Sequence, residues 1–104
     1  MTPADPPQEL TARFGDYLSE ARSAEWQALR QSLAIGASVA GSVIFRPPFA
    51  VFLDVGWGFP AILLATRFSP NLDSPDSLPP FGQFITGCVL RFSDSDRQIA
   101  LQQP

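Results

Sequence analysis

Few residues of this sequence are suited to catalysis. The 104 residues include one cysteine, Cys88, and no histidine. Asp94 and Asp96 form a closely spaced pair of carboxylates, and such pairs can bind a metal ion or share acid–base chemistry. They lie, however, in a Ser-Asp-Ser-Asp stretch typical of a hairpin turn, where aspartate accepts local hydrogen bonds. Zinc needs more cysteine and histidine ligands than this chain has, and no serine or cysteine stands beside an activating base. We therefore expect no enzyme activity, no metal ion and no cofactor.

Recognition through aromatic rings is a second kind of chemistry, and the sequence indicates it around Trp57. This residue stands between Gly56 and Gly58, in a composition typical of a tight turn, where a large ring is hard to bury. An exposed tryptophan usually marks a contact surface, and Phe59 would extend the same patch. The alternative is a ring folded back over the neighbouring strands. Trp57 and Phe59 are therefore candidate contact residues.

Five short apolar runs, each bounded by turn residues, predict the elements that position these side chains. The runs cover residues 39–46, 49–55, 59–66, 84–92 and 97–101. Alternation in the first run places Val39, Val43 and Phe45 on one face. The third run is almost continuously apolar, which predicts burial on both faces. Five short strands with few long connections predict a mainly β protein, a small closed antiparallel barrel.

Two amphipathic helices are predicted before the strands, over residues 8–21 and 24–34. Two apolar stripes recur at helical spacing, formed by Leu10, Phe14, Tyr17, Leu18 and Ala21, and then by Trp26, Leu29 and Leu33. A shift between the stripes indicates a break near Ser23, which we expect to be the N-cap of the second helix. Gly36 is expected to close that helix.

The chain is predicted to be a single domain in three parts. Residues 1–7 contain three prolines and are expected to be disordered, residues 8–34 form a helical extension packed on the barrel, and residues 35–104 form the barrel. Residues 69–83 contain four prolines and are expected to form a long irregular connection. This connection is either a plain linker or a functional loop.

Composition limits the cellular setting and the class of partner. The chain has seven arginines, no lysine and a formal net charge of −3, whereas non-specific polyanion binders are normally cationic. The N-terminus lacks the basic and apolar regions of a secretory signal, and no apolar run approaches the ~20 residues needed to cross a bilayer. A lone cysteine fits a reducing compartment. We expect a cytoplasmic protein with no membrane partner.

The barrel segment resembles the ribosomal protein S-one type RNA-binding domain, a five-stranded OB-fold. The likeness covers about residues 35–103 and follows the order and spacing of the family's motifs. The matching motifs are Gly41-Ser42-Val43, then Phe49-Ala50-Val51-Phe52-Leu53 with Asp54 and Gly56, then Gly87-Cys88-Val89, and last Arg97-Gln98-Ile99-Ala100-Leu101. The fold class that the resemblance implies is a mainly β OB-fold barrel.

The resemblance also implies a site. Family members typically bind single-stranded RNA on the face of the second and third strands, where aromatic rings stack on bases. Phe49 and Phe52 match the two stacking aromatics, Arg97 matches a basic residue of the last strand, and Asp94 approximately matches its acidic neighbour. Ala50 stands where the family has glycine, Leu63-Leu64 occupies a region where a histidine is common, and the usual lysines are missing. By alternation Phe49 belongs to the core face, and Phe52 to the outer face with Ala50 and Asp54.

Two hypotheses for the function follow. In the first, the protein is a weak single-stranded RNA-binding module, with Phe52, Trp57 and Phe59 stacking on bases and Arg46, Arg91 and Arg97 contacting phosphates. In the second, the barrel has lost most of its RNA affinity and binds a protein partner. That partner would contact the 56–59 turn, the exposed side of the first helix and the 69–83 loop. An arginine-rimmed aromatic face favours RNA, and one rimmed by Asp54, Asp94 and Asp96 favours a protein.

Overall fold

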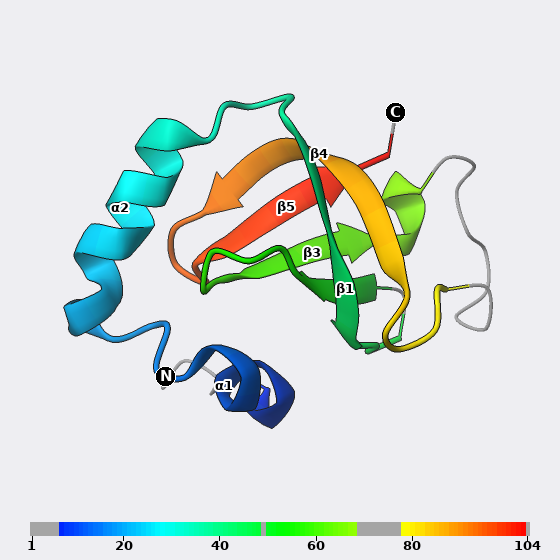
Figure 1. Cartoon of the computed structure of the whole chain (residues 1–104), viewed down its shortest axis with the longest axis horizontal. Helices are drawn as coiled ribbons and strands as arrows, with labels where there is room; N and C mark the ends of the chain where they lie inside the picture. Colours follow the sequence, from blue (N-terminus) through cyan, green and yellow to red (C-terminus); the bar gives the residue numbers. More distant parts are fainter. Residues whose placement is uncertain (1–6, 49, 69–77, 104) are drawn as a thin grey trace.

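A computed structural model describes residues 7–48, 50–68 and 78–103 of the chain. Five strands close into a barrel in the order β1-β2-β3-β5-β4 (Figure 1), so the predicted fold class is confirmed. The strands are β1 (Ser38–Phe45), β2 (Ala50–Asp54), β3 (Pro60–Leu64), β4 (Phe84–Ser93) and β5 (Gln98–Gln102).

The strand directions differ from the predicted, purely antiparallel arrangement. Strands β3 and β5 are parallel, while the other four neighbouring pairs are antiparallel. The reason is topological: an odd number of strands cannot alternate in direction all the way around a closed ring. As a consequence, the carboxyl ends of β3 and β5 meet at the same end of the barrel.

Alternating burial defines the inner and outer faces of the barrel. Val51 and Leu53 of β2, Ala61 and Leu63 of β3, and Ile99 and Leu101 of β5 are almost completely buried. Burial of both faces of β3 was predicted and is wrong for the end of the strand, because the outward-facing side chain of Leu64 is 42% exposed.

A register shift between Val43 and Phe45 corrects the predicted faces of β1. Val43 pairs with the inward-facing Leu53, whereas Phe45 pairs with Phe52, so the extra residue Ile44 turns Phe45 to the outer face. A second shift, between Val89 and Arg91 in β4, places Arg91 opposite Ala100. These two irregularities decide which side chains the outer face presents.

Gly41 of β1 is required by the close approach of two strands. A Cβ atom at this position would overlap the carbonyl group of Asp54 in β2 and come within 2.9 Å of Val55. Because backbone atoms cannot move aside as a flexible side chain can, only glycine lets β1 and β2 pair here.

The helical segments are shorter than predicted. They are α1 (Gln8–Phe14), the 3-10 turn η1 (Glu20–Arg22), α2 (Ser23–Ser32) and the 3-10 turn η2 (Ala65–Arg67). The prediction of a helix over residues 8–21 is wrong, because Gly15 adopts a φ of +69° and ends α1.

The predicted ends of the second helix also need correction. Ser23 is the first residue of α2, so it is not the N-cap. Arg22 occupies that position, and its side chain makes no capping hydrogen bond. The helix ends at Ser32, before Gly36, whose backbone N–H donates to the carbonyl oxygen of Val89 at 2.7 Å. Gly36 therefore belongs to the turn that leads into β1.

The helical segments pack against the barrel through the predicted apolar stripes. Leu10, Tyr17 and Trp26 are each at most 1% exposed and belong to the same core cluster as the strand residues. Figure 1 shows α2 beside the left-hand end of the barrel and α1 below it. The limits of the three predicted parts, residues 1–7, 8–34 and 35–104, stay a prediction, and residues 1–6 lie outside the described residues. Within the described part of the chain, no helix has the length and apolar character needed to span a membrane.

Candidate nucleic-acid interface

Phe52, the aromatic candidate on β2, is less accessible than predicted. Phe49 lies outside the described residues. Phe52 faces outward, as alternation predicted, but its side chain is only 7% exposed, so its predicted accessibility is wrong. The ring of Phe45 stacks on it, with ring centroids 5.7 Å apart and planes inclined by 26°. The bulge in β1 is the cause, because it turns Phe45 onto the ring of its neighbour.

Phe59 is a core residue, and its prediction as part of an exposed patch is wrong. Its side chain is fully buried, the indole ring of Trp26 lies against it at a centroid distance of 5.2 Å, and the Arg22 guanidinium lies 4.9 Å from the ring centre. Trp57, two residues earlier, is 44% exposed, as its glycine-flanked position predicted. Helix α2 therefore covers one of these two rings and leaves the other accessible.

Arg97 and Asp94, the charged residues matched by the resemblance, are engaged within the fold. Arg97 Nη1 donates to the carbonyl oxygens of Tyr17 at 3.1 Å and Ser19 at 2.6 Å. Asp94 accepts hydrogen bonds from Trp26 Nε1 at 2.8 Å and Arg30 Nη1 at 2.9 Å. Both contacts tie the β4–β5 turn to the N-terminal segment. A role in RNA binding would first require these bonds to break.

Most other arginines also have partners. Arg13 forms an ion pair with Asp54 at 2.7 Å, and one guanidinium nitrogen of Arg46 donates to the carbonyl oxygen of Leu78 at 3.0 Å. Arg22 contacts the Glu25 carboxylate and the carbonyl oxygens of Phe14 and Gly58. These arginines hold segments distant in the sequence together, and Arg46 remains exposed despite its bond.

Arg67 and Arg91 differ from the other five arginines. Over residues 7–48, 50–68 and 78–103, the side chain of neither makes a hydrogen bond or an ion pair. Both line one partly enclosed groove of 150 Å³ on the outer face of β3, β5 and β4. The groove is lined by Ile62, Leu64, Arg67, Leu90, Arg91, Ser93, Asp96, Gln98, Ala100 and Leu101. Two cations without side-chain partners in the described part of the chain therefore share a groove whose lining is half apolar.

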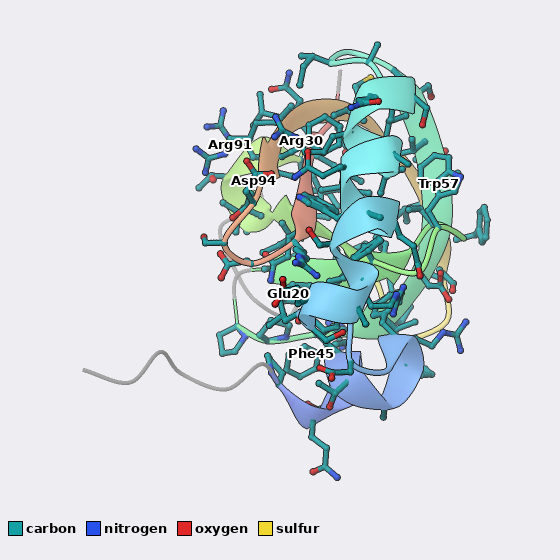
Figure 2. All side chains as sticks on the ribbon, turned by 90° about the vertical axis from the view of Figure 1, so that its left-hand side faces the viewer. Glu20, Arg30, Phe45, Trp57, Arg91 and Asp94 are labelled. Atoms are coloured by element: carbon teal, nitrogen blue, oxygen red, sulfur yellow. The ribbon has the colours of Figure 1, made fainter. Side chains whose placement is uncertain are left out.

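The groove continues the aromatic stack of the outer face. Phe45 pairs with Phe52, Phe52 with Ile62, Ile62 with Ala100, and Ala100 with Arg91, which makes one row across all five strands. Arginine and aromatic side chains thus share a face, as the RNA hypothesis required: Phe52 and Arg91 were predicted members, whereas Phe45 was not, and Arg97 is engaged elsewhere. Trp57 lies apart from this face, because Figure 2 shows it on the opposite side of α2 from Arg91 and Asp94.

Sequence reasoning found Arg91 and missed Arg67. Arg67 ends the short turn η2 directly after β3, and its carbonyl oxygen accepts a hydrogen bond from the backbone of Gln103, just beyond β5. The signal was its position, since residues that follow two parallel neighbouring strands meet at one end of a barrel. Had the parallel pairing of β3 and β5 been expected, Arg67 would have been predicted to lie beside the end of the last strand.

The carboxylates of the β4–β5 turn make local contacts. Ser93 Oγ donates to Asp96 Oδ2 at 3.1 Å, the kind of bond that turn aspartates were expected to make. Among the side chains that the structure describes, no three potential ligands lie close enough together to hold a metal ion.

Comparisons with known proteins identify the fold. No protein-family model matches the chain, and a search of the curated proteins gives no similar sequence. GSP13 from Bacillus subtilis is similar in structure, with a TM-score of 0.59 and 13% identity over 67% of this chain and 55% of that one. A chain of the a/eIF2alpha–aDim2p–rRNA complex from Pyrococcus horikoshii OT3 gives 0.58 and 19%, over 66% and 43%. A putative exosome complex RNA-binding protein gives 0.56 and 24%, over 67% and 42%. This chain spans about half the length of these proteins, and the likeness shows a shared OB-like barrel.

Proposed function

We propose that the barrel binds single-stranded RNA along the row from Phe45 to Arg91, with the groove of β3, β5 and β4 as its main contact. The observation that carries the proposal is that Arg67 and Arg91, the two arginines with no side-chain partner among the described residues, line the same groove. Guanidinium groups contact phosphates well, and groups without internal partners lose no protein contacts in doing so. Structural neighbours described as an rRNA complex and as an RNA-binding protein support this class of ligand.

The apolar groups between the arginines supply the second part of the interaction. Leu64 is 42% exposed and Ile62 and Phe45 are half-buried, so bases would pack on aliphatic side chains and the edge of one ring. Full stacking on exposed rings contributes about 1–3 kcal/mol per base, and this face offers less. Arg46, at the Phe45 end of the row, can add a third contact through the guanidinium nitrogens that do not bond Leu78. We therefore propose a weak, non-enzymatic binding module.

The charge count predicts a modest dependence on salt. Each phosphate contact to a single strand contributes about −0.7 to the slope of log K against log salt, so Arg67 and Arg91 predict a slope near −1.4, and the added contact of Arg46 would bring it to about −2.1. A steeper slope would require further cations, and those described elsewhere in the fold are paired.

Protein binding remains the second candidate, because a separate apolar surface favours it. Phe81 and Phe84 are 73% and 70% exposed. Phe81 lines a shallow depression with Ile44 and with Glu9, Ala12 and Arg13 from the α1 region. Glu9, Ala12 and Arg13 belong to the first helix, and Phe81 lies at the described end of the 69–83 loop. Both segments were predicted to contact a partner. Residues 69–77 lie outside the described residues.

The test is a titration of labelled oligo-U and oligo-A RNA with the protein, followed by fluorescence anisotropy at low and near-physiological salt. The proposal predicts binding to both oligonucleotides that weakens with salt along the shallow slope given above. No binding at low salt would overturn it. In that case, substituting Phe81 and Phe84 in affinity purification would test the protein-binding alternative.

A further inference from the structure

The two ends of the groove differ in charge. At the β4–β5 turn, Ser93 pairs with Gln98, and Asp96 follows in the turn beyond them. At the other end lie Leu64, which ends β3, and Arg67 of η2. Arg91 and Ala100 pair between the two ends. An acceptor end and a cationic end are therefore separated by the length of a few strand residues, at about 3.3 Å per residue.

The floor of the groove suits a flat ring. Ile62, Leu64, Leu90 and Ala100 supply aliphatic surface, and the volume of 150 Å³ equals that of cavities known to hold about one benzene-sized ring. A phosphate group alone gains nothing from an aliphatic floor, because its oxygens prefer hydrogen-bond donors. The apolar floor therefore suits a base better than the sugar–phosphate backbone of a strand alone.

Asp96 restricts which base fits. A carboxylate only accepts hydrogen bonds, and the one that Asp96 accepts here comes from Ser93 Oγ at 3.1 Å. It would repel a phosphate and attract N–H groups. Guanine alone among the four RNA bases presents two adjacent donors, N1–H and the N2 amino group, on one edge. The neighbouring Gln98 carries an amide that can donate to the O6 atom beside them.

We infer that the groove is a subsite for one guanine nucleotide of the bound strand. Asp96 accepts hydrogen bonds from the N1–H and N2 amino groups of the base, Ile62 and Leu90 contact its face, and Arg67 and Arg91 contact the adjoining phosphates. This inference rests on the proposed function and adds base selectivity to it. The subsite lies on β3, β5 and β4, away from Phe45.

The test compares three labelled eight-residue oligonucleotides: all uridine, uridine with one central guanosine, and uridine with one central inosine, which lacks the N2 amino group. Bidentate contacts to a base give discrimination of about tenfold or more, so the guanosine strand should bind about tenfold more tightly than the uridine strand. The affinity of the inosine strand should lie between the two.

In Asp96→Asn, the guanosine-to-uridine affinity ratio should fall close to one, whereas in Asp16→Asn it should keep the wild-type value. Asp16 is an exposed carboxylate outside the groove, so the second variant removes the same charge.

The outcomes separate this inference from the proposed function. Salt-dependent binding of all three strands with equal affinity would overturn the guanine subsite and leave RNA binding standing. A guanosine preference that survives Asp96→Asn would also overturn it, since the base would then be read elsewhere. No binding of any strand would overturn both proposals.

Discussion

The covered end of the barrel and its outer groove use arginine in opposite ways. At the covered end, Arg22, Arg30 and Arg97 bond to carbonyl oxygens or carboxylates of other segments. In the groove, Arg67 and Arg91 have no such bonds within the described residues. The first set fastens the N-terminal helices to the barrel. The second set is available to a ligand. A charged residue that matches a binding motif is thus informative only once its partners are known.

Aromatic residues follow the same division. Trp26 and Phe59 meet at the covered end, where both are at most 1% exposed, whereas Trp57 projects from the neighbouring turn. The comparison predicts that substitutions at the covered end change stability and leave RNA affinity intact. Substitutions in the groove should do the reverse.

The largest predicted effect is a loss of stability in Trp26→Ala. The change removes a buried indole and its hydrogen bond to Asp94, and truncation of a buried large aromatic ring costs about 3–5 kcal/mol. Urea unfolding followed by circular dichroism measures the loss. Trp57→Ala is the matched control, and it should change the free energy of unfolding by less than about 0.5 kcal/mol because that ring is exposed. Equal losses in the two variants would contradict the division.

A smaller loss is predicted for Arg97→Gln. The variant loses the bonds from Nη1 to the carbonyl oxygens of Tyr17 and Ser19, and a hydrogen bond to a charged group contributes about 1.5–3 kcal/mol. Because Arg97 is only half-buried and solvent weakens its interactions, we expect a net loss of about 1–2 kcal/mol, around the lower limit of that range.

Arg91→Gln serves as the comparison for Arg97→Gln, since it removes the same charge from the same hairpin. It should leave the urea midpoint unchanged within error. If Arg91→Gln cost as much stability as Arg97→Gln, Arg91 would have a structural partner and the groove would lose one of its two free cations.

The smallest predicted effect is on the pH dependence of stability. Burial, and then the negative charge of Asp96, raise the pKa of Tyr17 above its ordinary value of 10.0. Below that value both the folded and the unfolded chain keep the phenol proton. Above it the unfolded chain loses the proton first, so the free energy of unfolding falls as pH rises. Tyr17 is the only tyrosine, and phenolate absorbance therefore follows this residue alone.

Urea midpoints between pH 8 and 11 should decline beyond pH 10 in the wild type and decline less in Tyr17→Phe. Asp96→Asn should move the phenolate titration to lower pH. An unshifted titration in the folded protein would show that the phenol is exposed to solvent.

The strands were predictable because their signal is local. Alternation and turn residues lie within each run, as in residues 84–92, and need no knowledge of the rest of the chain. The five short strands predicted a closed barrel, and the resemblance added the expectation of an OB-fold. The end of α1 was missed because apolar residues at helical spacing continue past Gly15 to Tyr17, although Gly15 adopts a φ of +69° and ends the helix.

The site was only partly predictable because its accessibility depends on distant contacts. Phe59 is buried by Trp26. Arg97 bonds to Ser19 and Tyr17, which precede it in the chain by 78 and 80 positions. Phe52 is covered because a one-residue bulge redirects Phe45. Arg67 joined the site through the parallel pairing of β3 and β5, which the expected antiparallel barrel lacked. None of these contacts has a local signature.

The most direct test of the account compares two double variants that each remove two positive charges. Arg67→Gln/Arg91→Gln empties the groove of cations, whereas Arg13→Gln/Arg30→Gln removes two arginines of surface ion pairs. Anisotropy of a labelled eight-residue oligo-U strand, titrated from low to near-physiological salt, gives the affinity and the salt slope of both variants. We predict that the groove variant binds at least about tenfold more weakly, with a salt slope of about −0.7 or shallower, since it loses both groove contacts and keeps only that of Arg46. At near-physiological salt the ion-pair variant should bind within about twofold of the wild type, because long-range attraction between exposed charges is then largely screened. Equal weakening in the two variants would show that net charge, not the groove, governs binding and would contradict the account.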